Sequence, residues 1–235
     1  ELYMEGTQYW NVTGNIDVSN GTVYVYGDYP YNTSVNGEGQ VWTSVNGNIS
    51  VGSSGVIDGV GLGFPTEVGP GYGSTNQAGG HGGYGDRDVV YGNASAPTSL
   101  GSGGHNNGGG SAIKLEASNV LEVDGIVDMK GVDGTWQDTS SGGSIWLVAD
   151  NLTGSGTINA DGGSGTTGNG GGGGRIRLDF DSYNYDGVIS VDKGAGAGSS
   201  RPGTLLWGSK AGVTNYTWPG DGWTLNGSIG LPSGN

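Results

Sequence analysis

The sequence predicts an all-β fold in which successive coils of the chain stack into a solenoid. Two short apolar phrases, each present in three copies, lead to this prediction. The isoleucines of the first phrase, Ile113, Ile145 and Ile176, are 32 and 31 residues apart, and the second phrase follows about a dozen residues later. It occurs at 125–128, 157–160 and 188–191. Self-similarity with a period of roughly 20–50 residues is typical of solenoids and repeat arrays.

Composition points the same way. Glycine makes up 55 of the 235 residues, which disfavours helices, and the apolar residues fall in short alternating runs that are typical of strands. Only 7 prolines are present and glycine has no strict period of three, so collagen is excluded. A β-sandwich or jelly roll is the alternative all-β architecture. We expect glycine at the corners of the coils, where positive φ is needed.

We predict one solenoid domain over 1–235, divided into four stretches. Residues 1–62 hold strand candidates and a degenerate copy of the second phrase at 56–59, and 63–110 form a glycine-rich excursion that is functional or partly disordered. Residues 111–208 hold the clear repeats and a shorter echo at 204–207, and 209–235 form a cap or edge strand. The early strand candidates are 9–12, 15–18, 22–26, 40–45, 48–51 and 55–57.

Within a repeat, alternate side chains should face the shared core. In the second copy, Ile145 and Leu147 would point inward, while Ser144, Trp146 and Val148 would point outward. Because both faces carry bulky residues, we expect the outer face to be partly covered. Stacked coils would align the inward aliphatic residues in ladders.

The repeated segments read GGGSAIKLEA, GGSIWLVADNLTGSGTINADGG and GGGGGRIRLDF. This pattern resembles the glycine-rich repeats of large secreted or cell-surface β-helix proteins, including adhesin-like ones, over residues 101–208. The resemblance implies a right-handed parallel β-helix and an extracellular location. It implies no catalytic residues, because the motif contains none.

Charge and cysteine content limit the possible partners. The net charge of −14 argues against nucleic acid and against an anionic lipid surface. No run of 18 apolar residues is present, so we predict no membrane span. The chain has no cysteine, which excludes disulfides and thiolate metal sites. Because it begins at Glu1, we expect a processed or excised segment.

Eight Asn-X-Ser/Thr sequons favour a glycosylated, secreted protein. The alternative is that sequons follow from the abundance of Asn, Ser and Thr in a turn-rich chain. The candidate glycosylation sites are Asn11, Asn20, Asn32, Asn48, Asn93, Asn151, Asn215 and Asn226.

Acidic residues recur beside the second phrase. If the coils stack, Asp128, Asp161 and Asp192 line one edge and offer oxygen ligands suited to Ca²⁺. The alternative is that these aspartates cap turns by accepting hydrogen bonds from nearby backbone N–H groups. His81 and His105 lie in similar glycine frames, and we interpret them as turn residues in preference to metal ligands. We predict no other cofactor.

Aromatic residues gather in two places, which favours either core packing or stacking on sugars. One group is Tyr24, Tyr26, Tyr29, Tyr31 and Trp42, and the other is Trp207, Tyr216, Trp218 and Trp223. We predict no enzymatic activity. A polysaccharide lyase or hydrolase is the alternative, and its candidate charged cluster is Lys114 and Arg177 with Glu116 or Asp179.

We therefore expect an extracellular structural protein that is a subunit of a surface filament or sheath. Solenoid ends expose strand edges that pair with neighbours, and the candidate edges are 2–4 and 223–231. The expected partners are further copies of the chain. The second hypothesis is an adhesin or carbohydrate-binding module whose partner is a polysaccharide or another cell-surface ligand.

Overall fold

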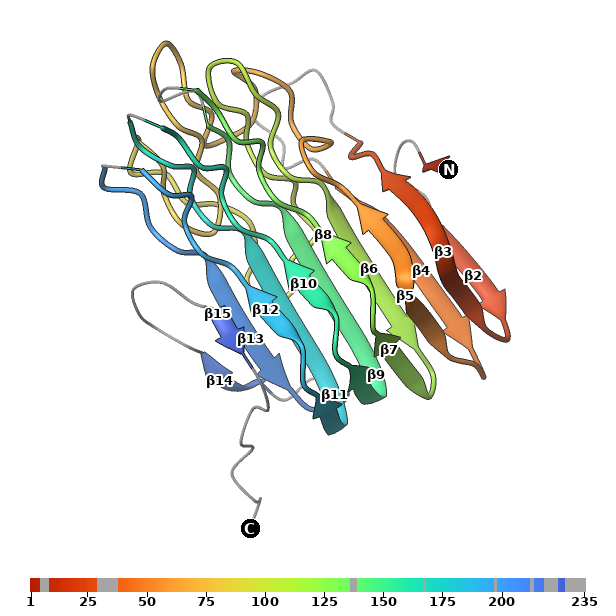
Figure 1. The fold of residues 1–235 in the computed structure, drawn as a ribbon. Helices are drawn as coiled ribbons and strands as arrows, with labels where there is room; N and C mark the ends of the chain where they lie inside the picture. Colours follow the sequence, from red (N-terminus) through yellow and green to blue (C-terminus); the bar gives the residue numbers. More distant parts are fainter. Residues whose placement is uncertain are drawn as a thin grey trace.

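A computed structural model describes residues 1–4, 9–28, 38–135, 139–166, 168–196, 198–211, 214–217 and 224–226, the last two without their side chains. These residues contain no helix, and thus none that could cross a membrane. They form a β-solenoid of about 6 turns (Figure 1). The strands are β1 (Leu2–Met4), β2 (Tyr9–Thr13), β3 (Ile16–Val25), β4 (Gln40–Val45), β5 (Ile49–Asp58), β6 (Ala112–Ala117), β7 (Val120–Val123), β8 (Ile126–Asp128), β9 (Ser144–Gly154), β10 (Thr157–Asn159), β11 (Arg175–Tyr185), β12 (Val188–Ser190), β13 (Thr204–Gly208), β14 (Thr214–Thr217) and β15 (Thr224–Asn226).

The strands stack in two columns. The first column runs β2, β4, β6, β9, β11, β13, and the second runs β3, β5, β8, β10, β12. Every neighbouring pair within both columns is parallel. A parallel stack is the β-helix that the repeats predicted, and it excludes the sandwich alternative, because sandwiches are built from antiparallel sheets.

The aliphatic ladder of the first column is confirmed. Ile113 pairs with Ile145, which pairs with Ile176, which pairs with Leu205 of the short echo. All four side chains are buried in one continuous core. Each coil alone is too small to enclose an apolar face, so the shared core depends on stacking.

In the second column, the predicted alignment of the first copy is wrong by one residue. Ile158 pairs with Val127 and not with Ile126, and it pairs on its other side with Ile189. Val127 is fully buried, whereas Ile126 is 41% exposed. A slip of one residue moves a side chain to the opposite face of a strand, and only this register buries Val127.

The degenerate copy of the second phrase is confirmed in β5. Val56, Ile57 and Asp58 pair with Ile126, Val127 and Asp128 of β8. The early strands are longer than predicted, because β3 and β5 each join two of the expected segments into one strand of 10 residues.

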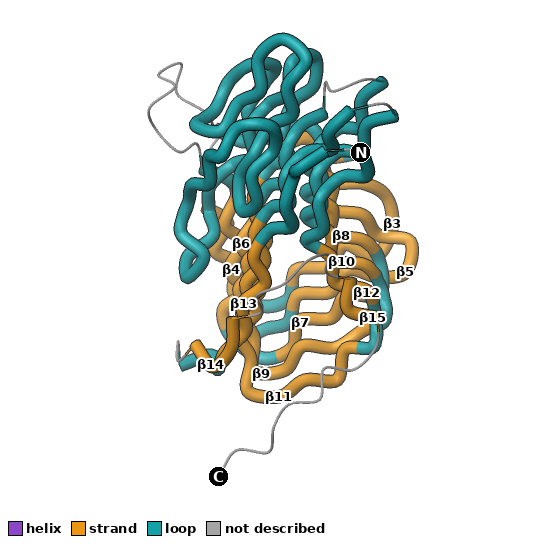
Figure 2. Tube along the Cα trace, turned by 90° about the vertical axis from the view of Figure 1, so that its left-hand side faces the viewer, coloured by secondary structure: helices purple, strands orange, loops and turns teal. Residues whose placement is uncertain are grey.

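The loops between the strands form a second layer. Figure 2 shows the strands gathered in one half of the molecule and the loops in the other. We call this half the glycine layer; it comprises the excursion at 59–111 and the glycine-rich loops within 129–143, 160–174 and 191–203. Extended segments of this layer lie side by side and exchange backbone hydrogen bonds: Gly110 N–H donates to Ser141 O (2.9 Å), Gly142 N–H to Gly172 O (3.0 Å), and Gly172 N–H to Gly79 O (2.9 Å).

Close backbone approach explains most of the glycine in this layer. A Cβ on Gly143 would lie 1.7 Å from Ser111 O, and one on Gly110 would lie 1.8 Å from Met129 O. Among the described glycines only seven have positive φ, so the expectation that glycine mainly serves corner conformations is wrong. Any side chain at the other positions would push neighbouring segments apart.

The excursion packs against the solenoid and has its own small core. Phe64, Leu100 and Ala112 are fully buried together. As predicted, the outer face of the first column is covered, because Ser144 Oγ donates to Ser99 O of the excursion (2.7 Å) and Val148 is buried.

The two ends of the solenoid differ. At the C-terminal end the chain reverses, so that β14 pairs antiparallel with β13 and β15 pairs antiparallel with β12. At the N-terminal end, β2 is parallel to β4 and β1 is parallel to β3. Most of the predicted edge segment at 223–231 lies outside the described residues, and only β15 of it is seen.

Candidate functional site

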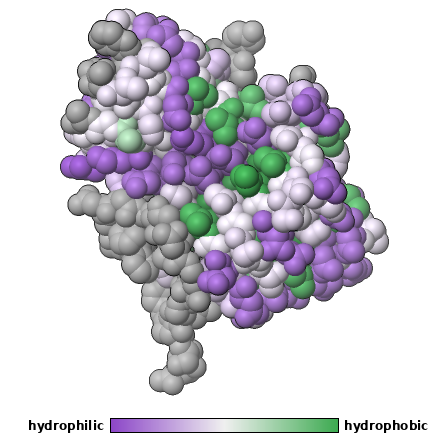
Figure 3. Space-filling view, in the orientation of Figure 1, coloured by the Kyte–Doolittle hydropathy of each residue, from purple (hydrophilic) through white to green (hydrophobic). Residues whose placement is uncertain are grey.

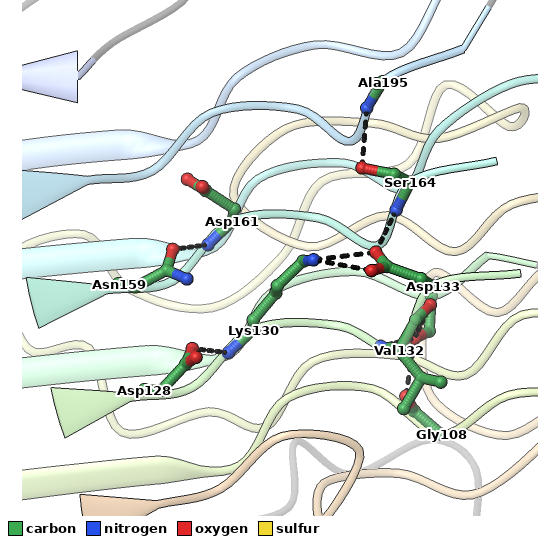
Figure 4. Close-up of polar contacts among 10 residues, drawn as sticks. Gly108, Asp128, Lys130, Val132, Asp133, Asn159, Asp161, Ser164 and Ala195 are labelled. Atoms are coloured by element: carbon green, nitrogen blue, oxygen red, sulfur yellow. Dashed lines mark hydrogen bonds and ion pairs between the residues drawn. The ribbon is translucent and has the colours of Figure 1, made fainter. Parts of the chain in front are cut away.

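The predicted row of aspartates is a series of turns that end the strands of the second column (Figure 4). Asp128 Oδ1 accepts a hydrogen bond from Lys130 N–H, and Asn159 Oδ1 accepts one from Asp161 N–H, each at 2.9 Å. Asp58 makes the same contact with Val60 N–H at 2.9 Å. These are the turn-capping contacts that were one of the two interpretations of the sequence.

The three candidate ligands do not share one ladder position. Asp128 pairs with Asn159, which pairs with Ser190. Asp161 and Asp192 lie two residues beyond that position, and Asp161 Oδ1 accepts hydrogen bonds from Ser190 Oγ and Asp192 N–H. No group of three or more His, Cys, Asp or Glu side chains arranged to hold a metal ion occurs in the described residues. Calcium binding therefore stays a prediction.

Burial raises the pKa of two of these carboxyl groups. The pKa of Asp128 rises to about 6, chiefly because the group is desolvated, and nearby Asp58 and Asp161 add to the rise. The pKa of Asp161 is also raised by burial, although hydrogen bonds from Ser190 and Asp192 oppose the shift. At neutral pH the row thus holds partly buried negative charge.

One cation lies beside the row. Lys130 Nζ is 2.7 Å from Asp133 Oδ1, and it points away from Asp128 toward the glycine layer (Figure 4). Asp133 Oδ1 also accepts a hydrogen bond from Ser164 N–H, and Ser164 Oγ accepts one from Ala195 N–H. Asp133, Ser164 and Ala195 thus form a polar ladder between loops of three coils, which the strand pattern could not predict.

The sequons differ in exposure. Asn11, Asn20 and Asn93 are exposed, whereas Asn48 and Asn151 are half-buried. Asn48 Oδ1 accepts a hydrogen bond from Val120 N–H, and Asn93 Oδ1 accepts one from Ser95 N–H. Asn32 lies outside the described residues; Asn215 and Asn226 lie in β14 and β15, where side chains are not described. Glycosylation stays a prediction at all eight sites.

Most of the described aromatic side chains are packed inside the molecule. Trp42 and Trp207 are buried in the core, and Trp10 stacks on Trp42 with ring centroids 5.7 Å apart. Tyr24 and Tyr26 are half-buried and meet the exposed Tyr3, whose ring stacks on Tyr24 at 5.0 Å. Tyr29, Tyr31, Trp218 and Trp223 lie outside the described residues, and the side chain of Tyr216 is not described.

The charged cluster considered for catalysis does come together on the outer face of the first column. Lys114, Trp146 and Arg177 occupy one ladder position on three coils. Lys114 Nζ lies 4.4 Å from the centre of the Trp146 ring and 2.6 Å from Glu116. Asp179 Oδ2 accepts hydrogen bonds from Arg177 Nε (2.7 Å) and Trp146 Nε1 (2.8 Å).

These contacts fasten the excursion to the solenoid. Arg177 Nη1 donates to Ser95 O (2.9 Å), and Arg175 donates to Tyr91 O through both Nε (3.0 Å) and Nη2 (2.7 Å). The cluster thus satisfies its own charges and holds a covering segment. Trp146, at the centre of this arrangement, was not among the predicted aromatic groups; its recurrence at the position of Lys114 and Arg177 was the available signal.

The two histidines have separate environments. His81 is fully buried, its Nδ1 lies 2.9 Å from Gly142 O, and its ring packs on Tyr91. Burial, with Arg175 nearby, lowers the pKa of His81 to about 3, so the ring is neutral at pH 7. His105 Nδ1 instead lies 2.6 Å from Glu67 Oε1 on the surface.

The strand edges at the ends of the solenoid remain as sites for an outside partner. Within the described part of the chain, β2 pairs only with β4, and β1 pairs only with β3. Gly14 N–H donates to Val45 O, so the pleat directs the N–H groups of Asn11 and Thr13 away from β4. Around this edge, Tyr9 is 71% exposed, Tyr3 55% and Leu2 45%.

The broad face that carries β8, β10 and β12 is less suited to a large partner. In Figure 3, which has the orientation of Figure 1, apolar residues form separate small spots among polar ones on this side of the molecule. Ile126 is the exposed large apolar residue of β8. Comparison of the chain with protein-family models, with curated proteins and with solved structures gives no match.

Proposed function

We propose that this chain is a structural subunit of an extracellular filament or sheath, and that its copies join through the strand edges at the ends of the solenoid. The observation that carries the proposal is the N-terminal edge formed by β1 and β2, which has unpaired backbone groups and exposed apolar side chains. Such an edge is a template for another strand.

The rest of the molecule supports a structural role. The chain spends its side chains on a ladder core and its glycines on close backbone contact, and the charged cluster on the outer face is paired internally. The exposed sequons at Asn11, Asn20 and Asn93 and the resemblance to repeats of secreted β-helix proteins support an extracellular location.

Electron microscopy and sedimentation velocity of the purified chain test the proposal. We expect rods or filaments whose amount rises with protein concentration. The variant Tyr9→Lys places a charge beside β2 and should reduce assembly. Val90→Lys is the matched control, because Val90 is also an exposed apolar residue (52%) but lies in the excursion. Monomers at every concentration, or equal loss in both variants, would count against the proposal.

A carbohydrate-binding adhesin is the second candidate, favoured by one observation. Tyr3, Tyr24 and Tyr26 form an aromatic cluster on the first coil, with Tyr3 largely exposed. Aromatic rings of this kind stack on the apolar faces of sugars. A glycan array separates the candidates: binding that disappears in Tyr3→Ala, while assembly persists, would favour the adhesin.

A further inference from the structure

Charge is distributed unevenly along the stacking axis. The first 38 residues contain five acidic residues and no basic one, and the first basic residue of the chain is Arg87. The last coil, 191–211, contains three basic residues and one acidic residue. The N-terminal end of the solenoid is therefore strongly negative, and the C-terminal end is weakly positive.

The charges at both ends are accessible to a partner. On the first coil, Glu1, Asp17, Asp28 and Glu38 are exposed. On the last coil, Lys193 and Arg201 make no ion pair with any part of the chain that the structure describes, and Lys210 is bonded to Asp150. Exposed charges of this kind steer association and choose between orientations more than they add affinity.

The strand edges of the two ends also correspond. The first column begins with β2 and ends with β14, and the second begins with β3, flanked by β1, and ends with β15. Each of β2, β1, β14 and β15 pairs on one side only among the described residues. Placing the end of one copy on the start of another therefore brings two pairs of edges together at once.

We propose that copies join head to tail, with the acidic N-terminal coil of one copy on the basic C-terminal coil of the next, and that charge selects this polarity. The inference rests on the proposed function and adds the partner surface and the orientation. Contact between two N-terminal ends would oppose five acidic residues to five, and contact between two C-terminal ends would leave every acidic end without a basic partner. Head-to-tail contact repeats without closing and gives a fibre.

A charge-swap experiment tests the polarity. Variant A carries Asp17→Lys and Glu38→Lys, which makes its N-terminal coil more basic. Variant B carries Lys193→Glu and Arg201→Glu, which makes its C-terminal coil acidic. The control, Asp88→Lys with Glu122→Lys, makes the same charge change as variant A at exposed residues away from both ends. Assembly is followed by sedimentation at low salt, with circular dichroism to verify that each variant is folded.

Head-to-tail polarity predicts that A and B each need about tenfold more protein than the wild type to assemble alone, while their equimolar mixture assembles like the wild type. Salt near 1 M, where screening acts over about 3 Å, should reduce the difference. The control should assemble at the wild-type concentration.

Other results overturn the inference in distinguishable ways. If B alone assembles like the wild type, the N-terminal ends meet each other; if A alone does so, the C-terminal ends meet. In both cases assembly stands and the polarity is wrong. If folded wild-type protein stays monomeric under all conditions, the proposed function fails, and the polarity fails with it.

Discussion

The strand half and the glycine layer of this molecule are held together by different means. In the strand half, side chains of equivalent residues form ladders, as in the column from Ile113 to Leu205. In the glycine layer, backbone lies directly on backbone, and a single Cβ at Gly143 would fall 1.7 Å from a carbonyl oxygen. The comparison teaches that a glycine-rich chain can be closely packed where its glycines are, and need not be loose there.

The largest expected effect is in the glycine layer. Gly143→Ala should destabilise the protein by at least about 4 kcal/mol or prevent folding, because the new methyl group meets Ser111 O and Gly110 O, which are backbone atoms. Thermal or denaturant unfolding measures the change. The matched control is Gly21→Ala, where φ is +84° but nothing lies within 4 Å, so only about 1 kcal/mol should be lost. Equal losses in the two variants would show that conformation, not close approach, is what matters.

The next effect is in the strand half. Leu147→Ala removes a buried side chain from the ladder and should lower the free energy of unfolding by about 2–5 kcal/mol. Ile126→Ala, on the exposed face of β8, should change it by less than about 1 kcal/mol. Denaturant titration of both variants tests the inward and outward assignment. A large loss at Ile126 would contradict the register in which Val127 faces the core.

A smaller effect is expected where the two halves meet. Arg175→Met removes the hydrogen bonds to Tyr91 O and should cost about 2 kcal/mol. The excursion should become easier to cleave by protease near Tyr91 while the strands stay protected. Arg87→Met, at an exposed residue of the same excursion, is the control. Unchanged cleavage in Arg175→Met would show that the excursion is held by other contacts.

The smallest effect depends on pH. Asp128→Asn keeps the hydrogen bond from Lys130 N–H, as Asn159 does one coil later, but removes a carboxyl whose pKa is raised to about 6. A raised pKa in the folded state means that the wild type gains stability as pH falls from about 6 toward 4. The variant should therefore be roughly 1–2 kcal/mol more stable than the wild type at pH 7, with no advantage near pH 4.

Melting temperatures at pH 4, 5, 6 and 7 measure this dependence. Asp88→Asn is the control, since Asp88 is exposed and the change in charge is the same. A variant that is less stable than the wild type at pH 7 would show that the charge of Asp128 is useful, for example to a bound cation.

The sequence predicted the strand half because side-chain ladders leave a repeating pattern of apolar residues. The one error of register has a local cause: Glu116 pairs with Val148, 32 residues on, but Val120 pairs with Asn151, 31 residues on. The extra residue therefore lies between Glu116 and Val120, where β6 and β7 are interrupted while β9 runs on. Matching isoleucine to isoleucine passes over this insertion.

The glycine layer could not be predicted in the same way. Contacts between backbones leave no periodic pattern of side chains, so residues such as Gly110 and Gly172 give no sign of their neighbours. The same holds for the candidate site. The turn-forming role of Asp128 was one of two stated interpretations, whereas the bonds from Arg175 and Arg177 to the excursion join residues more than 80 positions apart.

Amide hydrogen exchange at single-residue resolution tests the central claim most directly. Gly110, Gly142 and Gly172 donate backbone hydrogen bonds across the glycine layer, and Ile145 lies in the ladder of β9. If the two halves form one packed structure, the amides of these glycines should exchange as slowly as that of Ile145, within about tenfold. Exchange of the glycine amides at the rate of an unstructured peptide, with Ile145 still protected, would contradict the account.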